Sequence, residues 1–290
     1  MRPNDIKELL EENLTAGATG QPFPDERLLE LLNPPSEAAL TLHAVEAKNR
    51  LEASEIPVPE TLELVGHRSE IPKVIEFLVR KGTPFVVRPV HSKHGRGVLP
   101  CLYADESGVT KLSGEHLTLD TLKFHFYQIL DGEFSPAGKP DRVMVEEYLQ
   151  TSRQWIFPVN PGAPALRLIL CMNKLLAAEI RLPTLDSNGR IHVSCGAVRV
   201  PVDLETGRTL EGILGDDPLG HHPDTGIELA GHEVENLPAA IELGKRCCDV
   251  FNLGFLAVDI MEDVMETLVV LGIDASPRLC NIQQAIPPKP

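Results

Sequence analysis

The chain has 290 residues, 42% of them hydrophobic and 24% charged, with a formal net charge of −15, and this is enough apolar material for one large domain or two modest ones. It contains no apolar run near the roughly 20 residues of a membrane-spanning helix, its first residues do not resemble a secretory signal, and its acidic surface would repel nucleic acid and anionic lipid. We therefore expect a cytoplasmic protein with no nucleic-acid and no membrane partner, and a homo-oligomer stays open.

Helices are predicted mainly in the first half of the chain and strands in the second. Gly82 supplies the left-handed residue that ends a helix opened by Ser69. Alternating apolar residues predict an antiparallel strand pair joined by Asn173-Lys174. Because strands group with strands and helices lie outside them, the expected class is α+β. In chain order we expect helices after Asn4 or Asp5, over 26–33 after Asp25, over 36–54 and over 70–81, strands 85–90 and 98–104, a helix 118–130, strands 142–149, 165–172, 175–182 and 190–202, a helix 236–254, and strands 255–260 and 267–274.

A basic, glycine-containing segment separates the first two predicted strands. It reads Arg88-Pro-Val-His-Ser-Lys-His-Gly-Arg-Gly97, and its cations and free backbone N–H groups suit a polyphosphate. It has neither the G-x-x-x-x-G-K-[ST] pattern of a P-loop nor a G-x-G-x-x-G followed by a helix. By itself this pattern favours an ordinary basic hairpin.

Two further polar groups lie on predicted strands. Glu146 and Glu147 end the strand 142–149, where the backbone could meet a purine edge and a carboxylate could meet a ribose, although solvated acids at a strand end explain the pattern more simply. Period two puts Arg167 and Arg181 on polar strand faces, and a planar guanidinium suits a carboxylate or a phosphate. The alternative is that Glu179 merely pairs with an arginine on a solvated face.

The strongest single feature is a carboxylate inside an apolar strand. Asp259 lies in Phe255-Leu-Ala-Val-Asp-Ile260, where an unpaired carboxylate would be costly, so a metal, a cation or backbone N–H groups must satisfy it. If this strand and 267–274 form a hairpin, Asp259 and Asp274 can converge on Mg²⁺, which binds carboxylate and phosphate oxygens. The neighbouring histidines of His221-His222 lie among turn residues, so we expect a loop there and not a metal cluster.

These segments, in this order, resemble the ATP-grasp superfamily, and within it the alpha-L-glutamate ligase-related family, from about Lys48 to Gln284. The resemblance implies two α+β subdomains that grip ATP between them after an N-terminal helical segment. It divides the chain into a helical segment 1–47, a first subdomain 48–141 with the glycine loop, and a second subdomain 142–290 with the antiparallel sheet and the metal-site strands. Its most specific stretches are Arg181-Leu-Pro-Thr-Leu-Asp-Ser-Asn-Gly189, Gly196-Ala-Val with Asp203-Leu-Glu-Thr-Gly207, His221-His-Pro-Asp-Thr-Gly226 with Leu229-Ala-Gly231, and Phe255-Leu-Ala-Val-Asp-Ile260.

The resemblance also implies an activity and the residues that carry it. ATP would phosphorylate a small-molecule or peptide carboxylate, and an amine, such as glutamate or a related amino acid, would attack the acylphosphate to form an amide. ATP and Mg²⁺ are the implied cofactors, and catalysis would rest on positioning and electrostatics. The residues implied by position are Lys48, Arg88, Lys93, Gly95, Gly97, Glu146 and Glu147 for the nucleotide, Arg167, Arg181 and His192 for catalysis, and Asp259 and Asp274 for the metal.

The chain departs from that family at several polar positions. Gly272 stands where the family's last metal strand has a glutamate, and Asp274 stands where it has an asparagine. Arg88 replaces a lysine, Ala165 the aspartate of an Asp-x-Arg pattern, and His192 an asparagine. Three hypotheses follow: a ligase whose metal is held by two aspartates, a catalytically degenerate protein that binds nucleotide or a partner protein, and a structural interaction subunit. The retained glycine loop and both arginines favour the ligase.

Overall fold

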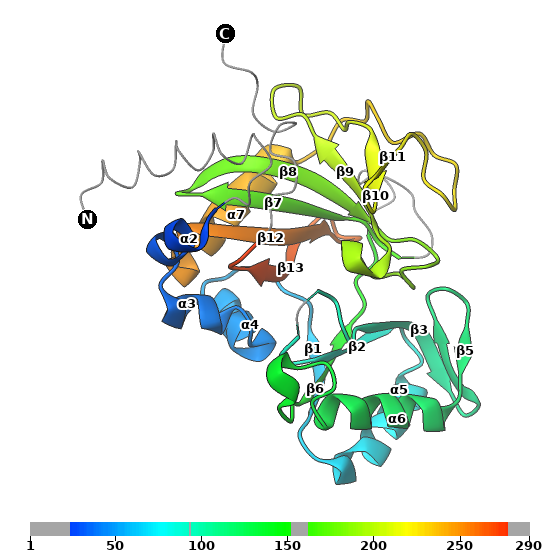
Figure 1. Cartoon of the computed structure of the whole chain (residues 1–290). Helices are drawn as coiled ribbons and strands as arrows, with labels where there is room; N and C mark the ends of the chain where they lie inside the picture. Colours follow the sequence, from blue (N-terminus) through cyan, green and yellow to red (C-terminus); the bar gives the residue numbers. More distant parts are fainter. Residues whose placement is uncertain (1–23, 93, 152–161, 278–290) are drawn as a thin grey trace.

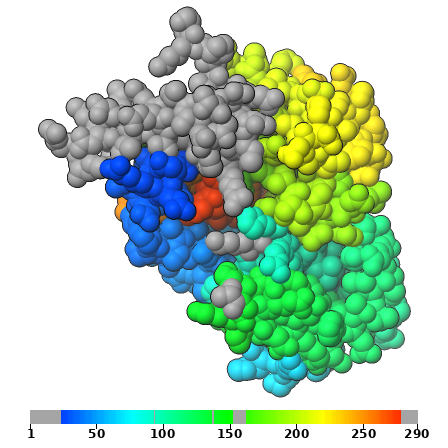
Figure 2. Space-filling view, viewed as in Figure 1, coloured from blue at the N-terminus to red at the C-terminus, as the bar shows by residue number. Residues whose placement is uncertain are grey.

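The protein is built from two lobes, each with one antiparallel sheet, and the expected α+β class is confirmed (Figure 1). The structure is a computed structural model that describes residues 24–92, 94–151 and 162–277. The lobe in cyan and green lies directly against the lobe in yellow-green and yellow (Figure 2). Within the described residues, every helix is too short or too polar to span a bilayer.

The first lobe is a six-stranded sheet with the strand order β1-β6-β2-β3-β4-β5. Two helices cover one face of it, α5 (Ile71–Lys81) and α6 (Leu119–Leu130). Strand alternation assigns the other face: Val143 and Val145 pack under the helices, so Met144 and Glu146 point the opposite way. The strands are β1 (Thr61–Val65), β2 (Phe85–Pro89), β3 (Leu99–Asp105), β4 (Gly108–Lys111), β5 (His116–Leu117) and β6 (Val143–Glu147).

Helix α5 shows how the local sequence builds this lobe. Its buried residues recur at helical spacing, which gives it one apolar face against the sheet. Gly82 ends it in the left-handed region at φ 59°, as predicted. Its start differs from the prediction, because a 3-10 helix, η1 (Arg68–Glu70), precedes it and the N-cap residue of α5 is Glu70, not Ser69. The Glu70 carboxylate does not cap α5 and instead accepts the backbone N–H of His67 at 2.9 Å.

The second lobe is a seven-stranded sheet with the order β11-β10-β9-β8-β7-β12-β13. Helix α7 (Leu237–Phe251) and the main apolar core cover one face, and α2 (Glu26–Leu32) packs on part of the other. The predicted β7–β8 pair and the predicted β12–β13 hairpin are both present. The strands are β7 (Ala165–Cys171), β8 (Lys174–Leu182), β9 (Val198–Val202), β10 (Gly212–Leu214), β11 (Asp217–Leu219), β12 (Phe255–Glu262) and β13 (Leu268–Asp274).

Three predicted elements differ from the structure. The helix expected over 36–54 is two helices, α3 (Pro35–Leu40) and α4 (Ala44–Ala53), because the Thr41 hydroxyl bonds back to the Ala38 carbonyl and His43 caps a new helix. The strand expected over 190–202 is extended only in β9, since a 3-10 helix, η3 (Val193–Cys195), interrupts it. Strand β6, which our division placed in the second subdomain, lies between β1 and β2 in the first sheet.

Asn33 joins the N-terminal helices to the start of β12 and the end of β13 in the second sheet. Its buried side chain donates to the carbonyls of Phe255 (2.6 Å) and Ala275 (2.7 Å) and accepts from the Phe255 N–H (2.9 Å). We expect Asn33→Ala to lower the free energy of unfolding by about 3 kcal/mol, because buried backbone groups lose their partner. Urea unfolding measures this loss. Glu30→Ala, on the exposed side of α2, should stay near the unaltered protein, and equal stability of both variants would contradict the assignment.

Candidate functional site

The second sheet carries polar side chains on the face opposite α7, beyond the part of that face that α2 covers. In the second sheet, Leu166 and Leu168 of β7 and Val258 and Ile260 of β12 face the apolar core. The residues between them, Arg167 and Asp259, therefore face the opposite side of the sheet. Strand register then aligns a polar row across β8, β7 and β12, because Arg167 pairs with Asp259 on one side and with Glu179 on the other. Asp259 in turn lies opposite Gly272. The polar residues predicted from four separate segments therefore form one surface.

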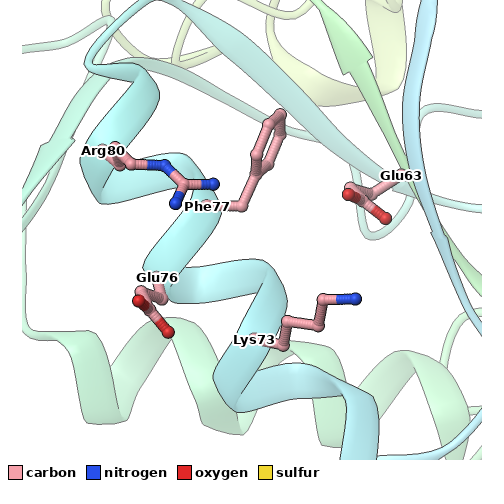
Figure 3. Close-up of a pocket in the computed structure, with 5 residues that line it drawn as sticks. All are labelled: Glu63, Lys73, Glu76, Phe77 and Arg80. Atoms are coloured by element: carbon pink, nitrogen blue, oxygen red, sulfur yellow. The ribbon is translucent and has the colours of Figure 1, made fainter.

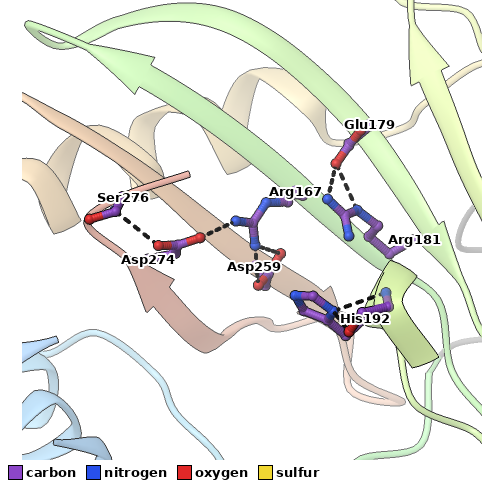
Figure 4. Close-up of polar contacts among 8 residues, drawn as sticks. Arg167, Glu179, Arg181, His192, Asp259, Asp274 and Ser276 are labelled. Carbon is purple, nitrogen blue, oxygen red and sulfur yellow. Dashed lines mark hydrogen bonds and ion pairs between the residues drawn. The ribbon is translucent and has the colours of Figure 1, made fainter. Parts of the chain in front are cut away.

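Arg167 is bound to both of the carboxylates that were expected to hold a metal. Its Nη1 donates to both oxygens of Asp259, at 3.1 and 2.8 Å, and its Nη2 donates to Oδ2 of Asp274 at 2.6 Å (Figure 4). Burial opposes the charged form of Arg167, but Asp259, Asp274 and Glu179 outweigh it and raise the pKa of the guanidinium. The carboxylate of Asp259, whose side chain is 20% exposed, is thus satisfied by a cation, one of the three partners the sequence left open.

The donor set around Asp259 suits a hard cation. Mg²⁺ is commonly bound by one or two carboxylates, with phosphate and water completing its shell, and Asp259 and Asp274 supply two carboxylates around a single cationic position. A Cβ on Gly272 would meet no atom within 4 Å, so this side of the site is open. Among the described residues, no three His, Cys, Asp or Glu side chains gather as a ready-made metal cluster. The two aspartates fit such an ion, and Arg167 would have to release them.

Arg181 is the next residue after Glu179 on the same face of β8, and it binds Glu179. Its Nε donates to Oε1 of Glu179 at 2.7 Å, and Nη2 contacts the same oxygen. Arg199 reaches the other oxygen of Glu179 at 3.9 Å. The alternative stated from the sequence, an ion pair between Glu179 and an arginine, is therefore present. It does not lie on a solvated face, because Arg181 is only 8% exposed.

In the first lobe, Lys48, Arg88 and Glu146 form a second charged group. Lys48 donates from Nζ to Glu146 at 2.6 Å and to Thr61 at 2.8 Å, and it also contacts the carbonyl of Pro59. Arg88 Nη1 donates to the other Glu146 oxygen at 3.3 Å. Lys48, predicted to contact the nucleotide, is thus held between α4 and the strands β1 and β6. Glu147, also predicted there, accepts the backbone N–H of Glu60 at 2.8 Å.

Arg88 carries a donor that has no partner. Its Nε is buried, and no hydrogen-bond acceptor reaches it among the residues that the structure describes. Buried donors are nearly always satisfied, so an orphan at this position indicates a missing acceptor. A phosphate oxygen is such an acceptor, and a guanidinium is well suited to it.

The glycine loop after β2 reaches across to the second lobe. The Ser194 hydroxyl donates to the His94 carbonyl at 3.1 Å, and the His94 and His192 rings meet edge to face with centroids 5.1 Å apart. Gly95 has φ 68°, and a Cβ there would lie 3.1 Å from Cβ of His192, so only glycine fits without strain. Gly97, with φ 72°, is packed against Phe134 in the same way. Lys93, the remaining predicted loop residue, lies outside the described residues.

His192 lies beside the polar row of the second sheet (Figure 4), and its ring meets that of His94 in the glycine loop. Its Nδ1 accepts the Ser194 backbone N–H at 3.2 Å and contacts the Ser194 hydroxyl at 2.8 Å. Burial, followed by the charges of Arg181, His94 and Arg167, lowers the pKa of His192 to about 4, while Asp274 acts in the opposite direction. The imidazole is therefore neutral at pH 7.

The lowered pKa of His192 predicts a pH-dependent contribution to stability. The folded value of about 4 is below the ordinary 6.5, so between these values the unfolded chain binds more protons than the folded one, and stability falls as pH falls from about 6.5 toward 4. His192→Asn should remove this part of the pH dependence, measured by urea unfolding at pH 7 and pH 5. The imidazole C–H resonance of His192 should titrate well below pH 6, and a midpoint near 6.5 would contradict the assignment.

Some site residues were not predicted from the sequence. Neither Ser194 nor Arg199 was predicted to be a site residue. Alternation outward from the apolar residues Val198 and Val200 could have placed Arg199 on the polar face. Ser194 lies in a 3-10 turn, for which no periodic signal exists. The histidine pair at 221 and 222 lies in a loop, as expected, and buried His222 contacts the Pro183 carbonyl at 3.0 Å.

A separate pocket lies between α5 and the edge strand β1, outside this site (Figure 3). Its volume is about 260 Å³. The lining mixes both signs of charge with one aromatic ring, so it selects no particular ligand chemistry. The lining residues are Glu63, Lys73, Glu76, Phe77 and Arg80.

Comparison with solved structures identifies the fold. The D-cycloserine synthetase DcsG superposes with a TM-score of 0.50 at 12% identity, covering 90% of this chain and 72% of that one. The VanG D-Ala:D-Ser ligase from Enterococcus faecalis gives 0.46 at 12% identity, with 83% and 54% covered. An ATP-grasp RimK domain protein from Sphaerobacter thermophilus gives 0.45 at 17% identity, with 82% and 60% covered. The chain thus spans little more than half of the latter two, and identities this low establish the fold alone.

Comparison with protein families shows which family the chain belongs to. No curated protein matches the chain significantly. The sequence profile of the family described as sugar-transfer associated ATP-grasp matches residues 25–286, nearly the whole chain. The ATP-grasp resemblance is therefore confirmed, whereas the finer resemblance to the alpha-L-glutamate ligase-related family stays a prediction. With this match over nearly the whole chain, the chain belongs to the sugar-transfer associated ATP-grasp family.

Proposed function

We propose that this protein binds ATP where the two lobes meet and uses it to join a carboxylate to an amine. ATP transfers its terminal phosphoryl group to the carboxylate, which gives an acylphosphate and ADP. The amine then attacks the acyl carbon, and phosphate leaves as the amide forms. The carboxylate is a small-molecule or peptide acid, and glutamate or a related amino acid is the amine that the sequence resemblance suggests.

The observation that carries the proposal is the unpartnered Nε of Arg88. It lies at the end of β2, immediately before the glycine loop, so a polyphosphate held by the loop would give this donor its missing acceptor. The loop itself contacts the second lobe through His94 and Ser194. A nucleotide held there would therefore have groups of both lobes around its phosphates.

The second lobe supplies the groups that would act on the transferred phosphoryl group. Arg167 and Arg181 are buried on adjacent strands and are held by carboxylates, so their guanidinium planes need little reorganisation to meet negative charge. His192 is neutral, and because its Nδ1 accepts a backbone N–H, its Nε2–H can donate to a developing oxyanion. Glu146 and Glu147 stay the groups proposed for adenine and ribose.

Asp259 and Asp274 are the residues that would hold Mg²⁺. When bound, the ion neutralises negative charge on the phosphates. Both aspartates come from neighbouring strands, so the β12–β13 hairpin fixes their separation. Arg167 lies between them and is the group that must move if they are to accept an ion.

A second candidate function is nucleotide binding without turnover. The observation that favours it is that Arg167 already neutralises the two aspartates, while Gly272 supplies no further carboxylate. In that case a nucleotide would bind through Arg88 and the glycine loop without needing a divalent ion. Metal dependence therefore separates the two candidates.

Calorimetric titration of ATP, with Mg²⁺ and with EDTA, tests the proposal. Mg²⁺-dependent binding supports the ligase, and equal binding in EDTA supports the second candidate. We expect Arg88→Ala to weaken ATP binding about tenfold to a hundredfold, the effect of losing hydrogen bonds to a charged group. Arg80→Ala, which removes an exposed arginine of α5 in the separate pocket, is the matched control and should bind normally. Absence of ATP binding by the folded, unaltered protein would contradict both candidates.

A further inference from the structure

The aspartates proposed for the metal are held by a cation that belongs to the chain. The Arg167 side chain is 9% exposed and spans Asp259 and Asp274 with its two Nη atoms (Figure 4). A guanidinium does not lose its proton in proteins, so no pH change frees these carboxylates. They become available to another cation only when Arg167 is displaced.

We infer that Arg167 is a resident cation that competes with a divalent metal for Asp259 and Asp274. The inference rests on the proposed function, which makes these aspartates the metal ligands. Arg167 and a divalent ion compete for the same two carboxylates, because the guanidinium bonds to both oxygens of Asp259 and to Oδ2 of Asp274, and a second cation brought this close is repelled by it. The other oxygen of Asp274 accepts the Ser276 backbone N–H at 2.9 Å. Metal entry therefore works against these three hydrogen bonds.

The charges around Arg167 indicate where the released guanidinium would turn. Glu179 lies directly opposite Arg167 on β8, but its oxygens already contact Arg181 at 2.7 Å and Arg199 at 3.9 Å. With three arginines around a single glutamate, the polar face then has an excess of positive charge. An anion such as a phosphate balances that excess, and the guanidinium fork fits it.

Metal and phosphate binding are therefore coupled through Arg167. A metal that takes the aspartates makes Arg167 available to phosphate, and a phosphate that attracts Arg167 frees the aspartates for metal. By linkage, each ligand strengthens the other by the same factor. Without phosphate, the metal competes against the full Arg167 interaction, so the unaltered protein should bind a divalent ion weakly.

Binding of Mn²⁺ alone, without nucleotide, tests the inference. Electron paramagnetic resonance measures the concentration of free Mn²⁺ in titrations of the unaltered full chain and of the Arg167→Met variant. Methionine keeps much of the side-chain volume and removes the charge. We expect Arg167→Met to bind Mn²⁺ at least tenfold more tightly than the unaltered protein. Its melting temperature should also rise with MgCl₂ relative to EDTA, whereas that of the unaltered protein should barely change.

Two control variants show whether the effect belongs to this pair of aspartates. Arg199→Met removes a partly buried arginine from the same sheet face, which touches Glu179 and not Asp259, and should leave Mn²⁺ binding unchanged. Arg167→Met/Asp259→Asn should lose the gain. An equal gain in Arg199→Met, or an undiminished gain in the double variant, would overturn the inference.

Arg167→Lys keeps the measurement decisive if the methionine variant does not fold. Lysine is a point charge that cannot bridge both aspartates as a guanidinium does, so we expect an intermediate gain in Mn²⁺ affinity. A folded Arg167→Lys protein with unchanged affinity overturns the inference. Because no nucleotide is present, this result is independent of whether ATP binds, and failure of the proposed function would appear separately in the ATP titration.

Discussion

Replacing Lys48 by methionine is expected to lower the free energy of unfolding by about 3–5 kcal/mol, because it leaves a buried carboxylate without its nearest cation. Lys48 Nζ lies 2.6 Å from Glu146, whose side chain is 6% exposed, while Arg88 remains at the longer distance of 3.3 Å. Urea unfolding of the nucleotide-free protein measures the loss. The effect should be among the largest of any single substitution at the site.

Two comparisons separate this charge effect from a general effect of losing a lysine. Lys48→Met/Glu146→Gln should recover a large part of the lost stability, because the uncompensated charge is gone. Lys245→Met removes an exposed partner of Glu242 and should change stability by about 0–1 kcal/mol. If Lys48→Met were instead as stable as the unaltered protein and bound ATP poorly, Lys48 would be a nucleotide ligand, as the sequence suggested.

Gly272→Glu/Asp274→Asn is expected to tighten Mg²⁺-dependent ATP binding by roughly tenfold, or ~1.4 kcal/mol. Gly272 lies opposite Asp259 in the β12–β13 register, and a side chain there meets open space. The double variant keeps two carboxylates near the ion. It removes the Asp274 carboxylate, which binds Arg167 at 2.6 Å. Calorimetry of ATP with Mg²⁺ and with EDTA measures the change.

The same variant also distinguishes an active enzyme from a degenerate one. If the unaltered protein is a ligase with its own metal geometry, the double variant should lose turnover while binding improves. If the unaltered protein is degenerate, turnover starts at zero and only binding changes. Asp274→Asn alone loosens Arg167 without adding a carboxylate, so it serves as the control. An unchanged Mg²⁺ dependence in a folded double variant would contradict the metal assignment.

Local sequence determined those parts of the fold that depend on nearest neighbours. Asp25 caps α2 by accepting the Leu28 N–H at 2.7 Å, and Gly82 ends α5 with the left-handed conformation that glycine adopts without strain. Alternation identified the β7–β8 pair, and an apolar run identified β12, whose hairpin with β13 was stated as a condition for the metal site and is present. Capping and period are local, so the sequence was sufficient.

Short strands and breaks between helices could not be predicted from capping residues and periodicity. Strand β5 has two residues and β10 and β11 have three each, too few to show a period. The break between α3 and α4 depends on the hydroxyl of Thr41 and the ring of His43, which compete with helix continuation only in this setting. The position of β6 between β1 and β2 follows from sheet pairing and not from its own residues.

The sequence by itself determined that Asp259 needs a partner, since a carboxylate inside an apolar strand cannot remain uncompensated. Only the tertiary structure decided which partner it has. Arg167 is 92 residues from Asp259 and 107 from Asp274, and the register of three neighbouring strands brings them together. Lys48 likewise reaches Glu146 across 98 residues. Pattern fixes which face a side chain occupies, whereas strand register and helix docking fix which opposite charge it meets.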